Sequence, residues 1–231
     1  MQNFHLSKRL TAISQFVTEG DRVADIGTDH AYVPIHLVEN GTIDFAIASD
    51  VGEGPVKIAK ANIEAAGLSD KIDVRLADGL TGIKPEDAVS AVIIAGMGGQ
   101  LINDILDAGL DYLDGTETLI LGPNRDVFEV RQWLNQHEFG IVDEAILEED
   151  GHVYEIVVAG RTKPEVPYTD ADLQFGPILR KQKSPLFIEQ LKIRGEKTEA
   201  ILAGLSDANL VPFTKIREQE NLLKLIEAEL A

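Results

Sequence analysis

The sequence predicts an α/β fold: a seven-stranded, mostly parallel sheet that closes in an antiparallel edge hairpin, followed by a small helical domain. Strand-length apolar runs alternate with helix-length amphipathic segments through the first 160 of the 231 residues, a pattern typical of parallel sheets with crossover helices. Two further apolar runs meet at Asp150-Gly151, a dipeptide that favours a tight hairpin. After Gly160 the pattern becomes helical.

The elements are expected in a simple order along the chain. The segment LSKRL, residues 6–10, belongs to a helix before the first strand. Runs rich in Val, Ile and Ala predict parallel strands at 22–27, 43–50, 71–76, 88–95 and 116–121, and a hairpin at 140–149 and 152–159. Five β/α units that end in such a hairpin fit the Rossmann-like class I methyltransferase fold better than a six-stranded, all-parallel dinucleotide-binding domain.

We expect two domains, residues 1–160 and residues 161–231. Residues 161–177 hold three of the nine prolines and break both periodicities, which predicts an irregular linker. Two helical segments follow, separated by the break GLSDANLVP. Their apolar residues predict an antiparallel helical hairpin or a short coiled coil. The residues concerned are Leu186, Ile193 and Ile201 in the first segment and Ile216, Leu222, Leu223 and Ile226 in the second.

Composition excludes several kinds of chemistry. The chain has no cysteine, which excludes disulfides, thiolate metal sites and a cysteine nucleophile. Its five histidines lack HxH and HExxH spacing, so no metal site is expected. No apolar run approaches the roughly 20 residues that span a bilayer, and residues 1–10 lack the apolar core of a signal peptide. We therefore expect a cytoplasmic protein, a monomer or weak dimer, with no membrane partner.

The charge is distributed unevenly along the chain. Residues 1–160 carry 10 Lys and Arg against 28 Asp and Glu, whereas residues 161–231 carry 11 of each. The acidic part argues against nucleic acid, because phosphate binding normally needs clustered basic residues. Residues 178–198, however, hold six basic and two acidic residues. This surplus predicts either a solvated helix face or a nucleic-acid surface.

The strongest motif, VADIGTDH at residues 23–30, follows the first strand. Gly27 lets a ligand approach the backbone, and the next helix offers unpaired amide groups. A dinucleotide site would have glycines in place of Thr28 and Asp29, and Asp29 would repel a diphosphate. The ammonium and sulfonium groups of S-adenosylmethionine would instead be attracted. The motif favours this cofactor over an ordinary acidic turn, with Asp25, Gly27 and Thr28 beside it. The sequence identifies no partner for His5 or His30.

Acidic residues also end the next two strands. Asp50, with Val51 after it, ends the second strand where a carboxylate can accept both hydroxyls of a ribose. Asp78 and Gly79 follow the third strand, where the carboxylate can accept from the adenine amine. Taken alone, each motif is also explained by an NAD site or by a plain turn. Three acids after three successive strands favour one shared cofactor.

The loop AGMGG at residues 95–99 connects the fourth strand to a helix that begins near Gln100. Its glycines let the backbone line a flat slot at the reactive end of a cofactor, with contacts at Gly96, Met97 and Gly98; a tight turn without a ligand is the alternative. Arg9 in the first helix can reach a ligand carboxylate or remain a surface arginine.

The motifs LSKRL, DIGTDHAYVP, SDV, ADGL, IIAGMGG and LGPN, together with the helical tail, resemble the TrmK family of bacterial tRNA (adenine-N1) methyltransferases. The resemblance covers essentially the whole chain. It implies methylation of N1 of adenine 22 in tRNA with S-adenosylmethionine as cofactor, and C-terminal helices that help to hold the RNA. The basic residues assigned to that RNA contact are Arg180, Lys181, Lys183, Lys192 and Arg194.

For such a reaction few catalytic groups are needed, because N1 of adenine has a lone pair and positioning can supply much of the acceleration. Asp29 is the candidate catalytic residue, since a carboxylate near the exocyclic amine stabilises the developing positive charge. Tyr32 offers a stacking face to an extruded base, or is a core aromatic. Asn124 is a polar substrate contact, or part of a turn.

Two alternative functions remain at this level. An NAD(P)-dependent Rossmann enzyme would explain the strand pattern but not the missing glycines after Gly27. A non-catalytic scaffold protein that binds S-adenosylmethionine would keep the same fold without turnover.

Overall fold

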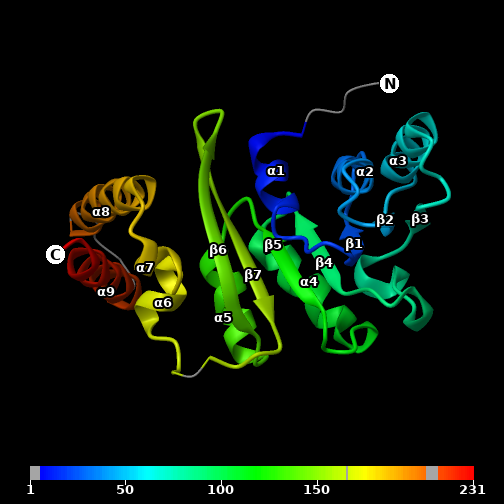
Figure 1. Ribbon diagram of the computed structural model, residues 1–231. Coiled ribbons are helices and arrows are strands. Elements are labelled where there is room, and N and C mark those ends of the chain that lie inside the picture. The colour runs from blue at the N-terminus through cyan, green and yellow to red at the C-terminus, as the bar shows by residue number, and fades with distance from the viewer. Residues whose placement is uncertain (1–5, 165, 207–212) are drawn as a thin grey trace. The chain divides into compact units, whose positions relative to one another are not determined.

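The predicted sheet is present in the structure, a computed structural model that describes residues 6–164, 166–206 and 213–231. The chain divides into two units, which we call unit 1 (Met1–Tyr168) and unit 2 (Thr169–Ala231). Unit 1 contains the sheet and unit 2 is helical (Figure 1). The domain boundary predicted after Gly160 lies inside unit 1 by this division and stays a prediction.

The seven strands lie in the order β3-β2-β1-β4-β5-β7-β6. The strands of the parallel part are β1 (Arg22–Ile26), β2 (Phe45–Asp50), β3 (Ile72–Leu76), β4 (Ala91–Ala95) and β5 (Thr118–Gly122). The antiparallel hairpin of β6 (Gly140–Glu149) and β7 (His152–Gly160) joins the sheet through β7. The predicted α/β, Rossmann-like sheet with its edge hairpin is confirmed.

The hairpin turns where the sequence places it. Asp150 has φ 50° and Gly151 has φ 75°, so both central residues are left-handed, as a type I′ turn requires. β6 and β7 pair from Gly140↔Gly160 to Glu149↔His152, with one irregularity between Ile141 and Asp143. The turn chemistry therefore fixes the register of the sheet edge.

Helices flank the sheet in unit 1 (Figure 1). They are α1 (Lys8–Ser14), α2 (Tyr32–Glu39), α3 (Glu53–Ala66), α4 (Gly99–Gly109) and α5 (Val127–Gln136), with 3₁₀ turns at Gly79–Gly82, Pro85–Asp87 and Leu110–Tyr112. The central strands are almost fully buried: Val23, Ile47, Ile93 and Ile120 are at most 1% exposed. Strands covered on both faces read as continuous apolar runs in the sequence, which is why they could be located. None of the described helices is long and apolar enough to span a membrane.

Polar contacts attach α5 to its neighbours. Arg131 is fully buried and pairs with Glu144 of β6 and Glu155 of β7. Trp133 is 5% exposed, and its Nε1 donates to Oδ1 of Asp107 in α4 at 2.7 Å. Because a buried charge needs a partner, the pairs of Arg131 hold α5 in one position against the hairpin.

Unit 2 consists of α6 (Asp170–Phe175), α7 (Leu179–Gln182), α8 (Pro185–Ser206) and α9 (Phe213–Leu230). The prediction of an irregular segment is wrong for 170–175, which form α6. Thr169 caps this helix: its hydroxyl accepts from the backbone amide of Asp172 at 3.2 Å. In turn, the backbone amide of Thr169 donates to the Asp172 carboxylate. This Thr-x-x-Asp capping box was present in the sequence as a helix start signal.

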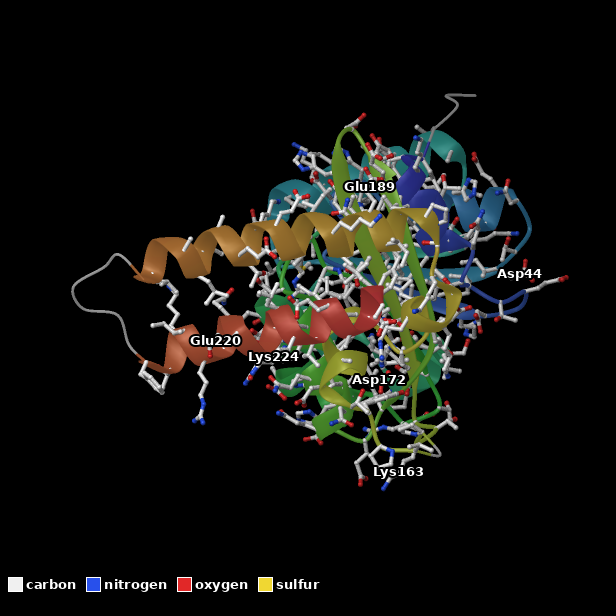
Figure 2. All side chains as sticks on the ribbon, turned by 90° about the vertical axis from the view of Figure 1, so that its left-hand side faces the viewer. Asp44, Lys163, Asp172, Glu189, Glu220 and Lys224 are labelled. Atoms are coloured by element: carbon white, nitrogen blue, oxygen red, sulfur yellow. The ribbon has the colours of Figure 1, made fainter. Side chains whose placement is uncertain are left out.

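The helices α8 and α9 lie side by side and run in opposite directions, as predicted (Figure 2). In α9 the predicted Ile226 is buried, at 1% exposed, but the buried residues of α8 differ from those expected. Phe187, Leu191 and Thr198 are 3–4% exposed, whereas the predicted Leu186 and Ile193 are half-buried and Ile201 is 45% exposed. The apolar face of α8 is thus rotated relative to the predicted heptad positions, and the coiled coil stays a prediction.

Candidate active site

The turn after β1 is held by the end of β2. The backbone amides of Gly27 and Thr28 donate to the Ser49 carbonyl at 2.8 and 3.0 Å, and Thr28 Oγ1 accepts from the Ala31 amide at 3.0 Å. Gly27 (φ 77°) and Ala31 (φ 56°) are both left-handed. Glycine adopts this conformation freely, but alanine does so at a conformational cost that is typical of functional turns.

The turn after β1 also touches the AGMGG loop. A Cβ placed on Gly27 would lie 1.9 Å from Cε of Met97. The left-handed conformation therefore favours glycine at position 27, and a Cβ there would also displace the flexible end of the Met97 side chain. Because β1 and β4 are parallel neighbours, their carboxyl ends meet at one edge of the sheet and bring the two loops together.

A cavity of about 300 Å³ lies between these two loops and α1. Seven residues predicted from the sequence line it: Arg9, Asp25, Gly27, Thr28, Asp29, Gly96 and Met97. Its other lining residues are Leu10, His30, Val33, Ile93 and Ala95. The structure thus brings the β1 turn, the AGMGG loop and Arg9 to one site.

The inner wall of the cavity is acidic. Asp25 is 9% exposed, and its pKa is raised to about 6: burial is the largest cause, a hydrogen bond from the Thr28 side chain opposes the rise, and the nearby Asp50 carboxylate adds to it. Asp50 lies outside the lining of the cavity, at the end of β2, and is oriented by the Gly52 amide, which donates to its Oδ1 at 2.7 Å. Two carboxylates at the ends of neighbouring strands favour a cation over a phosphate at this position.

The outer wall carries Asp29, which is partly exposed. Its Oδ2 lies 3.0 Å from Nε2 of His30. The His30 ring is stacked on that of Tyr32, with centroids 4.9 Å apart and 8° between the planes. Tyr32 opens α2 and is half-buried.

Two residues hold Arg9 in place. Its guanidinium donates to Oδ1 of Asn124 and lies 4.9 Å from the centroid of the Tyr154 ring. The side-chain amide of Asn124 in turn donates to the Gly96 carbonyl at 2.7 Å, and its backbone amide donates to the Met97 carbonyl at 2.7 Å. Asn124 therefore connects the exit of β5 to the AGMGG loop and to Arg9.

The remaining predicted residues of unit 1 lie outside the lining of this cavity. Asp78 and Gly79 line a second cavity of about 240 Å³ together with residues of α4 such as Leu101 and Ile105. The side chain of Val51 is 69% exposed. Gly98 pairs with Arg125 in an isolated bridge, beside the cavity residue Met97. Among the residues that the structure describes, no cluster of three or more His, Asp and Glu side chains is suited to a metal ion.

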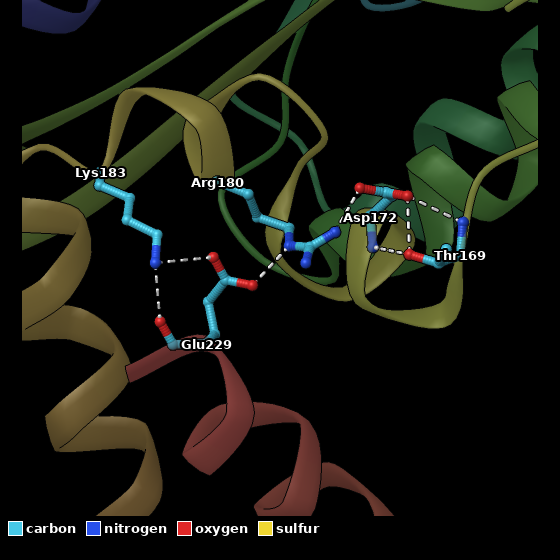
Figure 3. A network of polar contacts seen from close by, with 5 residues as sticks. All are labelled: Thr169, Asp172, Arg180, Lys183 and Glu229. Carbon is cyan, nitrogen blue, oxygen red and sulfur yellow. Dashed lines mark hydrogen bonds and ion pairs between the residues drawn. The ribbon is translucent and has the colours of Figure 1, made fainter. Parts of the chain in front are cut away.

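Two of the predicted basic residues of unit 2, Arg180 and Lys183, bond to Glu229 of α9 (Figure 3). Arg180 Nε donates to Oε2 of Glu229 at 2.7 Å, and the same guanidinium pairs with Asp172. Lys183 Nζ donates to the Glu229 carbonyl at 3.2 Å and lies 3.8 Å from its Oε1. Arg194 donates to the Gln174 side chain at 2.7 Å. Lys181 and Lys192 are exposed.

A family model described as TrmK, tRNA (adenine(22)-N(1))-methyltransferase, matches residues 23–228. The chain belongs to the TrmK family. The tRNA (adenine(22)-N(1))-methyltransferase of Bacillus subtilis (strain 168) is 41% identical over 233 residues, which cover 97% of this chain and 98% of that protein.

Solved structures of similar chains agree with this membership. A Streptococcus pneumoniae chain in complex with S-adenosyl-L-methionine has 41% identity and a TM-score of 0.88, covering 98% of this chain and 100% of its own. M. capricolum TrmK in complex with S-adenosyl-homocysteine has 30% identity and a TM-score of 0.84, with 97% of each chain covered.

Two residues of this TrmK-family site escaped the sequence prediction. His30 stands inside the DIGTDH motif, but its partners are its chain neighbour Asp29 and the ring of Tyr32. Tyr154 comes from the edge hairpin, far from Arg9 in the sequence. The motif contains His30 but does not reveal its partners, and nothing in the sequence signals Tyr154. His5 lies outside the described residues.

Proposed function

We propose that this TrmK-family protein transfers the methyl group of S-adenosylmethionine to N1 of adenine 22 in tRNA. The observation that carries the proposal is the acidic cavity between the β1 turn and the AGMGG loop, in a chain whose family is described by that reaction. The relatives solved with S-adenosyl-L-methionine and S-adenosyl-homocysteine support the same cofactor here.

The residues of the cavity fit a cationic cofactor. Asp25 and Asp50 supply negative charge, and the absence of a side chain on Gly27 leaves room there for the end of the Met97 side chain. We assign the ribose to Asp50 and Val51, the adenine to Asp78 and Gly79, and the ligand carboxylate to Arg9. Asp25, Gly27, Thr28 and the loop residues Gly96, Met97 and Gly98 complete the proposed contacts. An NAD(P) diphosphate would instead meet the carboxylates of Asp25 and Asp29.

When bound, the cofactor supplies an electrophilic methyl group. The part of this chain is then to hold the base and to stabilise the positive charge that the base gains as the N1–carbon bond forms. Asp29 is suited to both tasks, because its carboxylate lines the cavity and is not buried. It accepts from the exocyclic amine of adenine, and no proton has to leave N1. Tyr32 offers its ring to the extruded base.

The RNA contact of unit 2 rests mainly on Lys181 and Lys192. Both are exposed, and exposed basic side chains are available to phosphates. Arg180, Lys183 and Arg194 already bond to other groups of unit 2, although the Lys183 side chain is still 53% exposed. Their contribution to RNA binding is indirect, through the shape of the unit that presents the lysines.

The test is incubation with total bacterial tRNA and labelled S-adenosylmethionine, followed by nucleoside analysis. We expect labelled N1-methyladenosine, and none from a tRNA transcript in which adenine 22 is replaced by guanine. Cofactor binding without turnover on any tRNA would support a scaffold protein instead. Enhanced NADH fluorescence on binding, without affinity for S-adenosylmethionine, would support a dehydrogenase.

A further inference from the structure

The candidate catalytic carboxylate of Asp29 has a side-chain partner. Nε2 of His30 lies 3.0 Å from Oδ2 of Asp29, and both residues line the same cavity. The two side chains are 39% and 66% exposed. A pair of exposed side chains on a mobile loop would hold each other in place only weakly. The pair can orient Asp29 only if the backbone of the turn and the imidazole ring of His30 are themselves fixed.

The surroundings fix both. The carbonyl of His30 accepts from Nδ2 of Asn62 in α3 at 3.0 Å, which anchors its backbone to a separate helix. The next residue, Ala31, is fully buried and left-handed, with its amide bonded to Thr28 Oγ1. A non-glycine residue keeps this conformation only where its surroundings require it.

The ring is held as well as the backbone. It stacks almost parallel to the ring of Tyr32, at 4.9 Å between centroids and 8° between planes. Tyr32 begins α2, so its own position follows from the helix. The imidazole therefore has a defined place, and its Nε2 has a defined direction toward Asp29.

We infer that His30 is a positioning residue for Asp29. With the proton on Nε2, the neutral imidazole donates to Oδ2 and leaves Oδ1 to accept from the exocyclic amine of the target adenine. A carboxylate that rotates freely presents this oxygen only part of the time, whereas a fixed one is ready before the base arrives. The inference rests on the proposed function and adds to it a residue that holds the catalytic group.

Two substitutions of His30 test the role of its hydrogen-bond donor and the role of its aromatic ring separately. His30→Gln keeps an amide N–H near the place of Nε2 and loses the aromatic ring; His30→Phe keeps the ring and loses the donor. His36→Gln is the matched control, because His36 is the neighbouring histidine of α2 and bonds to Asn40 instead. The measurements are single-turnover methylation of tRNA and cofactor affinity by calorimetry.

We expect His30→Phe to slow single-turnover methylation about tenfold, a part of the loss expected for Asp29 itself. His30→Gln should lose less activity than His30→Phe, His36→Gln should stay within about threefold of the wild type, and cofactor affinity should hold in all three. In an Asp29→Ala background, His30→Phe should cause no further loss, since two residues that act through one interaction are not additive.

Full activity of His30→Phe in an otherwise active enzyme would overturn the inference and leave the proposed function intact. Equal losses for His30→Phe and His30→Gln, or additive losses with Asp29→Ala, would also overturn it, because the ring or the fold would then be the cause. A wild-type protein that methylates no tRNA refutes the proposed function and this role of His30 with it.

Discussion

Replacing Asp25 with asparagine should make the protein more stable and a weaker binder of its cofactor. Burial raises the pKa of this carboxyl from 3.8 to about 6. Because the folded protein holds the proton more tightly than the unfolded chain, folding stability falls as the pH rises from about 4 to about 6 and stays low above that range.

The magnitude follows from the same values. Each pKa unit between the unfolded and the folded state corresponds to about 1.4 kcal/mol, so an ionised Asp25 costs up to about 3 kcal/mol at pH 7.5. The amide of Asp25→Asn keeps the size of the side chain and an oxygen for the Thr28 hydroxyl, but carries no charge. We expect a gain of about 1–3 kcal/mol at pH 7.5, or several degrees in melting temperature for a unit of this size.

The assay is urea unfolding of the cofactor-free wild type and variant at several pH values between about 4 and 8. The gain should be largest at pH 7.5 and shrink to a small part of that value near pH 4, where Asp25 is protonated in the folded protein and close to half protonated in the unfolded chain. Asp44→Asn is the control, since the Asp44 side chain is 98% exposed and should give no comparable trend. With S-adenosylmethionine added, the wild type should become more stable than the variant, because the cationic cofactor favours ionised Asp25. An Asp25→Asn protein that gains the same stability at both ends of the pH range would refute the reasoning.

Four further outcomes are expected. Asp50→Ala should weaken S-adenosylmethionine binding by about 1–3 kcal/mol; unchanged affinity in calorimetry would exclude the ribose assignment. Asp29→Ala should lower kcat about 100-fold with little change in cofactor affinity, and a defect repaired by excess cofactor would make it a cofactor ligand only. Lys192→Glu should weaken tRNA binding and flatten its salt dependence, whereas Glu189→Lys, also on α8, should not weaken it. Glu229→Ala should destabilise unit 2 by roughly 2 kcal/mol in thermal unfolding, because Arg180 and Lys183 lose a buried carboxylate; an unchanged midpoint would contradict this.

The centre of the sheet was predictable because β1, β2, β4 and β5 are buried on both faces and appear as apolar runs. The edge hairpin was predictable because Asp150 and Gly151 suit the left-handed turn that they form. The inner cavity followed from the same logic, since parallel strands deliver their carboxyl ends to one edge and the motifs stand at those ends. Asp25, Gly27 and Met97 meet there for that reason.

What the sequence did not reveal are contacts set by side-chain direction. The charge of Arg180 was visible, but its partner Glu229 lies 49 residues away in another helix. The buried face of α8 depends on how that helix is rotated against α9, and a pattern with both Leu186 and Phe187 available does not fix the rotation. The aromatic contact of Tyr154 with Arg9 depends on where the hairpin passes the first helix, which spacing along the chain does not determine.

The environment of Trp133 gives this protein a selective optical probe. It is the single tryptophan of the chain, it is buried in α5, and its indole is bonded to Asp107 and stacked on His137. All four tyrosines also lie at or before Tyr168, so residues 169–231 contain neither chromophore. Indole emission during denaturation therefore follows the sheet-containing unit alone, while far-ultraviolet circular dichroism follows the helices of both units. Coincident midpoints would mean that the chain unfolds as one cooperative block, and separated midpoints would give the stability of each unit from a single unlabelled, full-length sample.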